Sequence, residues 1–463
     1  MSNFKLYKLS DCIEYIIDNR GKNPPLSGSG YELIETNMIS SNNKYPDFNK
    51  ATKYVSKEIY NSWFRKGHPK IGDILISTVG NIGKVAIINE NKGCIAQNLI
   101  GLRVNNIIQP EYLYYFLIKK DTQDKLLSLN IGSVQPSIKV PHLLNLNIYV
   151  PNLKTQKECI RILGDLDQKI QLNTQINQTL EQIAQAIFKS WFVDFDPVRA
   201  KAAALESGKT QAEAELAAMQ AISGKNAEEL AQMASENYTE LAEIAKAFPS
   251  AFGEDGVPVG WEVKRIDEVA NIIKGKSYKS SELAESTTAL VTLKSFNRGG
   301  GYRLDGLKEF TGKYKAEQEV FAGELIIAYT DVTQAADVIG KPAMVMSDSR
   351  YEHLVISLDV GVVRPFDEVY KYFLYCLAMT DSFQAHTKSF CTGTTVLHLG
   401  KDAVPSFEFV NPNDELLKIF CKQASPIFEK INLNIEENKS LEKTRDLLSP
   451  RLLNGDLQNI NEI

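Results

Sequence analysis

The stretch "IQLNTQINQTLE" at residues 170–181 has a near copy, "INLNIEENKSLE", at residues 431–442. Half of the twelve positions are identical without a gap. Each stretch lies in a longer segment whose apolar residues recur at spacings of three and four, the pattern of a helix with one continuous apolar seam. The chain therefore contains one long helix twice, at positions that differ by 261.

The two seams predict that these helices pair with each other. The expected pairing residues are Leu166, Ile170, Asn173, Asn177 and Leu180, with Ile427, Ile431, Asn434, Asn438 and Leu441 at the shifted positions. A buried asparagine costs stability but rejects wrong registers, because any slip leaves its amide facing hydrocarbon. Copies in one chain pair most simply as an antiparallel coiled coil about a pseudo-two-fold axis, with Asn173 opposite Asn438 and Asn177 opposite Asn434. An ordinary amphipathic pair within one larger core is the alternative.

The duplication extends beyond the helices. "GDILIST" from Gly72 is answered by "GELIIAY" from Gly323, and "PEYLYYFL" from Pro110 by "EVYKYFLY" from Glu368. The first pair are β-prone runs that follow a turn glycine, and the second pair are expected helices with an aromatic face. We expect an α+β chain with two mixed α/β domains separated by the long helices. The boundaries are a first domain at 1–150, a helical spacer at 151–199, an Ala/Glu-rich helical segment and linker at 200–256, a second domain at 257–412 and a second spacer at 413–463.

Composition describes a globular chain of 463 residues, with 43% hydrophobic and 24% charged residues. No run of about 18 apolar residues and no secretory signal is evident, so we expect a cytoplasmic protein without a membrane partner. The six cysteines are scattered without metal-ligand spacing, which predicts reduced thiols, no disulfides and no metal site.

The net charge of −5 is unevenly distributed. Residues 1–150 contain 18 Lys and Arg against 12 Asp and Glu, whereas residues 200–256 contain 4 against 10. The acidic surplus lies mostly in the Ala/Glu-rich segment, and a binding face depends on local charge, so a DNA partner is not excluded.

The candidate catalytic motifs in this sequence each lack a required feature. "KNPPL" from Lys22 is similar to the base-holding loop of adenine methyltransferases, but Leu26 replaces the stacking aromatic residue. "GKS" from Gly275 has Ala270 where a phosphate-binding loop needs glycine, and the five histidines lack ligand spacing. We expect no catalytic residues in this chain.

Both domains contain polar loops between β-prone runs that suit DNA. Lys and Arg neutralise phosphates, Asn and Gln can read adenine, and Arg can read guanine. The expected DNA-binding residues are Lys22, Asn23, Lys44, Lys50, Lys53, Asn81 and Lys84 in the first domain, and Lys274, Lys276, Lys279, Lys294, Arg298 and Arg303 in the second.

The segment "FKSWFVDFDP" from Phe188 places four aromatic residues where the first helix ends. It is either a partner-binding patch or a plug that seats the helix on one of the two domains, and we favour the plug.

The helical segments "QKECIRILGDLDQKIQLNTQINQTLEQIAQAIFKSWFVDFDPV" from Gln156 and "NLNIEENKSLEKTRDLLSPRLLNGDL" from Asn432 strongly resemble the two helical regions of type I restriction-modification specificity subunits. "GDILIST", "GNIGKVAI" and "NIGSVQPSI" look like that family's target recognition domains.

The resemblance implies a non-catalytic subunit whose two domains each read one half of a split, asymmetric DNA sequence, with the paired helices fixing the gap. It implies two methyltransferase subunits that bind S-adenosylmethionine, and two restriction subunits that use ATP and Mg²⁺ as partners. The alternatives are an architectural coiled-coil adaptor and the DNA-binding arm of a divergent nuclease or methyltransferase.

Overall fold

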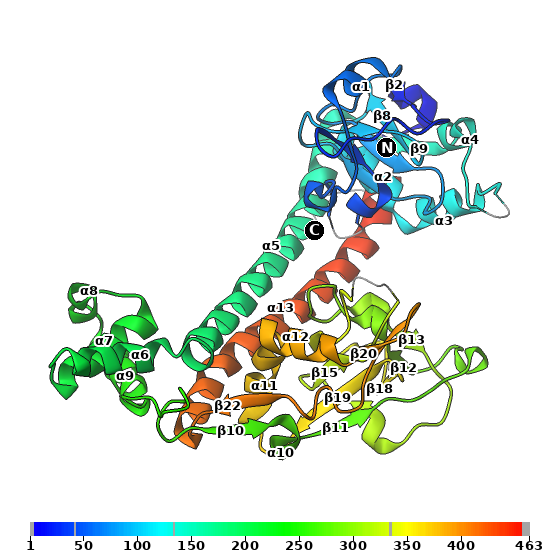
Figure 1. Cartoon of the computed structure of the whole chain (residues 1–463). Helices are drawn as coiled ribbons and strands as arrows, with labels where there is room; N and C mark the ends of the chain where they lie inside the picture. Colours follow the sequence, from blue (N-terminus) through cyan, green and yellow to red (C-terminus); the bar gives the residue numbers. More distant parts are fainter. Residues whose placement is uncertain (1–3, 41–42, 133–134, 333–335, 456–463) are drawn as a thin grey trace. The chain divides into compact units, whose positions relative to one another are not determined.

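A computed structural model describes residues 4–40, 43–132, 135–332 and 336–455 of the chain (Figure 1). The chain divides into two compact units: unit 1 comprises residues 1–176 with 434–463, and unit 2 comprises residues 177–433. The fold is α+β, with two mixed α/β domains related as an internal repeat and two long helices. Among the described residues, no helix is long and apolar enough to cross a membrane.

The described residues of the unit 1 domain form three small sheets. A two-stranded antiparallel sheet joins the beginning of the domain to its end, a four-stranded sheet has the order β2-β8-β5-β6, and a three-stranded sheet has the order β4-β3-β7. The strands are β1 (Lys5–Lys8), β2 (Ile13–Ile17), β3 (Tyr31–Ile34), β4 (Tyr54–Val55), β5 (Ile74–Ser77), β6 (Val85–Ile87), β7 (Cys94–Ile95), β8 (Leu99–Val104) and β9 (Asn147–Val150). The helices are α1 (Lys57–Ser62), α2 (Pro110–Ile118), α3 (Lys120–Ser128) and α4 (Val140–Leu144).

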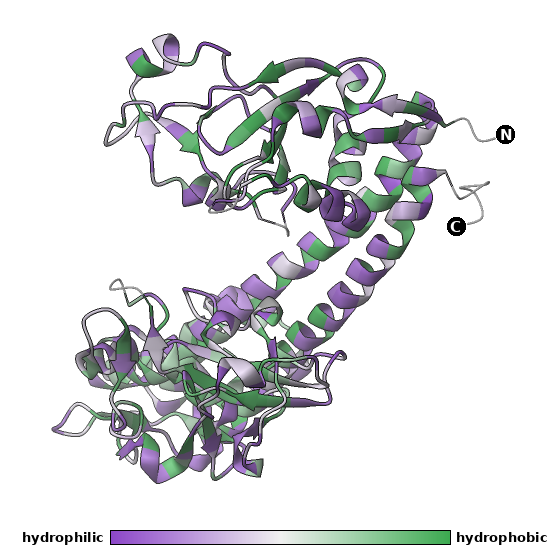
Figure 2. Ribbon diagram, turned by 90° about the vertical axis from the view of Figure 1, so that its right-hand side faces the viewer, coloured by the Kyte–Doolittle hydropathy of each residue, from purple (hydrophilic) through white to green (hydrophobic). Residues whose placement is uncertain are grey.

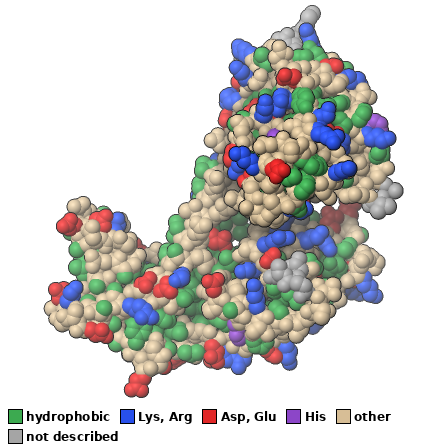
Figure 3. All heavy atoms as spheres, turned by 45° about the horizontal axis from the view of Figure 1, so that its top comes forward, with side chains coloured by type: hydrophobic (Ala, Val, Ile, Leu, Met, Phe, Trp, Pro, Cys, Tyr) green, Lys and Arg blue, Asp and Glu red, His purple; other side chains and the backbone are tan. Residues whose placement is uncertain are grey.

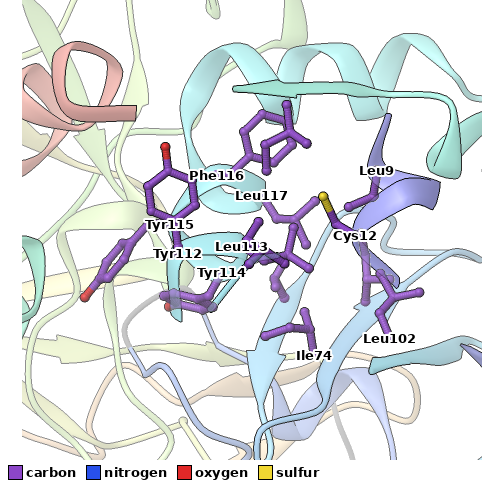
Figure 4. Close-up of a cluster of buried hydrophobic side chains, with 14 of the residues drawn as sticks. Leu9, Cys12, Ile74, Leu102, Tyr112, Leu113, Tyr114, Tyr115, Phe116 and Leu117 are labelled. Atoms are coloured by element: carbon purple, nitrogen blue, oxygen red, sulfur yellow. The ribbon is translucent and has the colours of Figure 1, made fainter. Parts of the chain in front are cut away.

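The core of this domain lies between α2 and the four-stranded sheet. The predicted aromatic helix is α2, and six of its nine residues, Tyr112 to Leu117, are buried. Figure 4 shows side chains of α2 directed toward Ile74 of β5, Leu102 of β8 and the Leu9–Cys12 turn. Because all four residues of β5 are buried, the "GDILIST" run is an interior strand, as its β-branched and apolar residues predict.

The domain of unit 2 repeats this plan. Its sheets have the orders β10-β22, β11-β19-β15-β17, β13-β12-β18-β14 and β16-β21-β20. The strands are β10 (Glu262–Arg265), β11 (Ala270–Lys274), β12 (Thr288–Val291), β13 (Lys308–Glu309), β14 (Glu319–Val320), β15 (Leu325–Ala328), β16 (Thr330–Asp331), β17 (Pro342–Met344), β18 (His353–Ile356), β19 (Val360–Pro365), β20 (Cys391–Thr392), β21 (Leu397–Leu399) and β22 (Glu408–Asn411). The helices are α10 (Ile266–Val269), α11 (Tyr370–Ala378) and α12 (Asp381–Ser389).

Equivalent polar contacts recur in the two domains. The acid after the turn glycine pairs with an arginine on the neighbouring strand in both: Asp73 with Arg103 at 2.7 Å, and Glu324 with Arg364 at 2.6 Å. Gln123 Nε2 donates to the Leu117 carbonyl at 2.6 Å, and Gln384 Nε2 donates to the Ala378 carbonyl at 2.8 Å. The sequence duplication is therefore a duplication of structure.

The two long helices, α5 (Leu153–Phe192) and α13 (Asp414–Asn454), pair antiparallel, as predicted. In unit 1, Asp167 bonds Arg445 at 3.0 Å and Asn173 Nδ2 donates to Asn438 Oδ1 at 2.9 Å, so rising numbers on α5 meet falling numbers on α13. In unit 2, the ring of Phe188 contacts that of Phe420. Figure 2 shows hydrophobic and hydrophilic residues alternating along both helices.

The asparagines in the apolar seam form equivalent hydrogen bonds in the two copies of the helix. Asn438 Nδ2 donates to the Ile170 carbonyl at 3.3 Å, and in unit 2 Asn177 Nδ2 donates to the Ile431 carbonyl at 3.3 Å. These are the same bond displaced by 261 residues. Asn173 and Asn434 are each 1% exposed, so they are buried polar groups of the seam. The other pairing residues are buried or half-buried: Leu166, Ile170, Leu180, Ile427, Ile431 and Leu441.

The Ala/Glu-rich segment forms its own helical bundle in unit 2. It consists of α6 (Asp196–Glu206), α7 (Gln211–Ser223), α8 (Ala227–Ala231) and α9 (Ser235–Ala247), drawn in green in Figure 1. The buried Lys201 of α6 donates Nζ to the carbonyls of Ala245 at 2.8 Å and Phe248 at 2.6 Å, and so satisfies the end of α9. Glu240 of α9 also pairs with Lys422 of α13 at 3.4 Å.

The aromatic end of α5 is a plug, as favoured from the sequence. Phe188, Trp191 and Phe192 are each at most 5% exposed. Their rings contact Phe420 of α13, and Phe188 and Phe192 also contact Phe373 of α11 at 5.0 and 5.2 Å. This cluster joins the two helices to the domain within unit 2.

Candidate nucleic-acid interface

Two of the predicted DNA-binding residues, Asn23 and Lys53, line one pocket of unit 1. The pocket has a volume of about 280 Å³, and its wall also contains Gln97 and Asn98 from the turn between β7 and β8. Its apolar lining comes from Pro24, Leu26, Leu33, Ile34 and Ala96. Three chain segments that are far apart in sequence thus meet around polar side chains on an apolar floor.

Hydrogen bonds hold these segments in place. Arg20 forms an ion pair with Asp18 at 2.7 Å, and this hydrogen bond holds the pKa of the Asp18 carboxyl below its ordinary value. Arg20 Nη1 also donates to Thr78 Oγ1 at 2.9 Å, and the Thr78 amide donates to the Asn98 carbonyl at 2.8 Å. The loop that carries Asn23 is therefore linked to the turn that carries Asn98.

The far end of that loop requires glycine. Gly30 has a φ of +133°, and a Cβ there would lie 2.2 Å from the Val55 carbonyl oxygen. No side chain fits so close to a backbone carbonyl, so Gly30 fixes where the loop joins the antiparallel pair of strands β3 and β4.

Two of the predicted lysines are paired with carboxylates at the surface. Lys53 Nζ lies 2.7 Å from Glu35, and Lys50 Nζ lies 3.1 Å from Asp47. Exposed pairs of this kind contribute little stability and exchange readily, so both lysines keep access to solvent anions.

Two other predicted lysines are bound within unit 1. Lys84 Nζ donates to the carbonyls of Thr36 and Ile39 at 3.0 Å each, and burial lowers its pKa. Lys44 lies over the Tyr115 ring at 5.6 Å, and its pKa is also lowered by burial. A lysine held this way anchors a loop, so the structure gives Lys84 a structural role that sequence reasoning missed.

Lys22 and Asn81 complete the predicted set in unit 1, and both are exposed. In the face that Figure 3 displays, Lys and Arg side chains gather over the domain of unit 1, whereas Asp and Glu are frequent over the α6–α9 bundle. The charge distribution expected from the sequence is thus visible on the surface.

The six predicted residues of unit 2 lie on β11, on the loop after it and on the loop after β12. Lys274 Nζ lies 4.8 Å from the Tyr329 ring centre, and the Lys276 amide donates to the Ile356 carbonyl at 2.8 Å. Lys276 is half-buried, and the exposed members of the set are Lys274, Lys279, Lys294, Arg298 and Arg303. Their role in DNA binding remains a prediction.

Gln97 and Asn98 were not predicted. Gln97 has a φ of +53°, a left-handed conformation that is unusual for a residue with a side chain. The signal that could have found them is an amide pair between two β-prone runs, at positions where the second copy has Leu358 and Asp359.

The chain is similar to known specificity subunits. The family pattern described as "Type I restriction modification DNA specificity domain" matches residues 1–182 and 258–443. The type I restriction enzyme HindI specificity subunit of Haemophilus influenzae is 36% identical over 84% of this chain and 87% of its own length. The MjaIX specificity subunit of Methanocaldococcus jannaschii is 24% identical over 88% of this chain and 81% of its own length. A crystal structure of the S subunit from M. genitalium covers 98% of this chain and 96% of its own chain at 15% identity, with a TM-score of 0.46. The chain belongs to the family of type I restriction-modification DNA specificity subunits.

Proposed function

We propose that this chain reads a bipartite, asymmetric DNA site with its two domains and has no catalytic activity of its own. The observation that carries the proposal is the duplicated domain with unlike loop residues, because two related but non-identical readers recognise unlike half-sites. In our proposal the complex acts in the cytoplasm on double-stranded DNA.

The partners follow from the family. Two methyltransferase subunits that bind S-adenosylmethionine would dock on this chain and methylate adenines. Two restriction subunits that use ATP and Mg²⁺ would cut unmodified DNA. The chain would supply selectivity and a scaffold to both, and would hold no cofactor itself.

The paired helices would set the gap between the half-sites. The hydrogen bond between Asn173 and Asn438 disfavours a slip of one helix along the other, because a slip would leave a buried amide without its partner. An added heptad keeps an apolar seam in phase and lengthens a helix by about 10 Å, which equals roughly three base pairs of B-DNA.

Methylation mapping in a host that expresses the chain with its methyltransferase partner tests this proposal. A heptad inserted before Asn173 and another after Asn438 lengthen both helices at the same level, and we expect the gap to grow by about three base pairs. The same insertion after Gly224, in the turn between α7 and α8, serves as the control and should leave the gap unchanged. Altered half-sites with an unchanged gap would contradict the ruler role.

Exchange of residues 1–150 for the corresponding domain of another specificity subunit tests the assignment of readers. We expect one half of the methylated sequence to change and the other half to stay. An architectural adaptor that binds no DNA would show neither change.

A further inference from the structure

The turn between β7 and β8 contains a pair of amide side chains that the fold itself does not use. Within the described residues, the side chains of Gln97, Asn98 and Asn23 have no hydrogen-bond partner, although Gln97 and Asn98 are both half-buried. Polar groups that line a pocket and pair with nothing inside the protein are available to a ligand.

The same turn in unit 2 shows that the left-handed backbone is not demanded by the fold. There, Leu358 and Asp359 connect β18 to β19, and Leu358 does not have a positive φ. The turn is held alike in both units, because the Asp359 carbonyl accepts the Tyr329 amide at 2.7 Å, just as the Asn98 carbonyl accepts the Thr78 amide at 2.8 Å. The left-handed backbone at Gln97 occurs in only one of two otherwise equivalent turns, and unrequired backbone strain of this kind points to a functional role.

The amide and apolar side chains of the pocket suit recognition of the edge of a DNA base pair. An Asn or Gln amide accepts from N6 and donates to N7 of adenine, which makes it the standard reader of that base in the major groove. The pocket wall also exposes Leu26, and an apolar side chain is what contacts a thymine methyl group. Among the described residues of the wall, Glu35 is the only carboxylate, and its ion pair with Lys53 at 2.7 Å offsets its charge.

We propose that Gln97 and Asn98, assisted by Asn23, are specificity-determining residues that read an A·T base pair in the half-site recognised by residues 1–150. This inference rests on the proposed function, and it adds the residues and the base. Because unit 2 has Leu358 and Asp359 at these positions, its half-site would be read by different contacts.

Gln97→Gly tests the role of the longer amide without endangering the fold. Glycine adopts a positive φ without strain, so this variant loses the side chain but suits the turn better than glutamine does. Asn98→Ala removes the second amide and keeps the backbone carbonyl that Thr78 needs. Asn89→Ala removes an exposed amide of the same domain outside the pocket and is the matched control.

The measurement uses the complex of the full chain with its methyltransferase partners. After methylation mapping has identified the site, competition binding compares the native duplex with duplexes that carry single A·T to G·C changes at each position. Loss of one bidentate contact should reduce discrimination about five- to 150-fold at one A·T position of one half-site. Discrimination at the second half-site should be the same as in the unaltered complex. The Asn89→Ala variant should discriminate as the unaltered complex does at every position.

Two results would overturn the inference: unchanged discrimination at every position in the Gln97→Gly, Asn98→Ala double variant, or an equal loss of binding to every duplex. Neither would affect the proposed function, which fails only if the unaltered complex shows no preference for a bipartite site.

Discussion

Replacement of Asn173 by leucine tests whether the buried amide pair locks the helices in register. Asn173 Nδ2 donates to Asn438 Oδ1 at 2.9 Å and to Glu437 at 2.8 Å, and its own Oδ1 accepts from Lys169 at 3.1 Å. Asn173→Leu leaves the Asn438 oxygen without this donor in an apolar seam, which should cost about 1–3 kcal/mol. Asn438→Leu should cost a similar amount.

The double variant should be much more stable than additivity implies. With both amides replaced by leucine, no buried polar group is left unpaired, and such exchanges are close to neutral or stabilising. We therefore expect a coupling free energy of at least about 1 kcal/mol between the two positions. Hydrogen exchange of the α5 amides measures this locally, which suits a chain of two units better than global unfolding.

The reasoning is refuted if the two substitutions act additively on hydrogen exchange. Gln178→Leu, at an exposed position outside the seam, is the control and should change stability by less than about 0.5 kcal/mol.

Three further predictions concern unit 2. Phe420 is 1% exposed, and its ring contacts four aromatic side chains. Phe420→Ala should therefore destabilise unit 2 by about 3–5 kcal/mol, as measured by thermal unfolding. The control Leu433→Ala, at a 65% exposed position, should have almost no effect. Lys201→Met leaves the last carbonyls of α9 without their donor, and we expect faster proteolysis within residues 196–247. The hydrogen bond from His353 Nδ1 to Glu319 raises the pKa of the histidine above its ordinary value of 6.5. The contribution of this contact to stability is therefore complete below pH 6.5, and it is lost as the pH rises through the raised pKa. Nuclear magnetic resonance titration should show that pKa falling toward 6.5 in Glu319→Gln, and an unchanged value would contradict the assignment.

Much of the fold is determined locally and could be predicted. The helix period, the asparagines in the seam and the 261-residue repeat are properties of short stretches, and they specify two long helices and their antiparallel pairing. The interior strands were predictable for the same reason, since runs such as β5 and β15 are apolar and β-branched. The aromatic plug was also predicted, because four rings at a helix end need a surface to cover them.

The loops were determined only by tertiary structure. Lys22 and Lys84 look equivalent in the sequence, but Lys84 bonds two carbonyls that lie more than 40 residues away and Lys22 is exposed. The pocket that contains Asn23 and Asn98 likewise forms from segments that lie far apart along the chain. Periodicity records which face of an element is buried, whereas the direction of a loop side chain depends on distant backbone groups that the fold brings next to it.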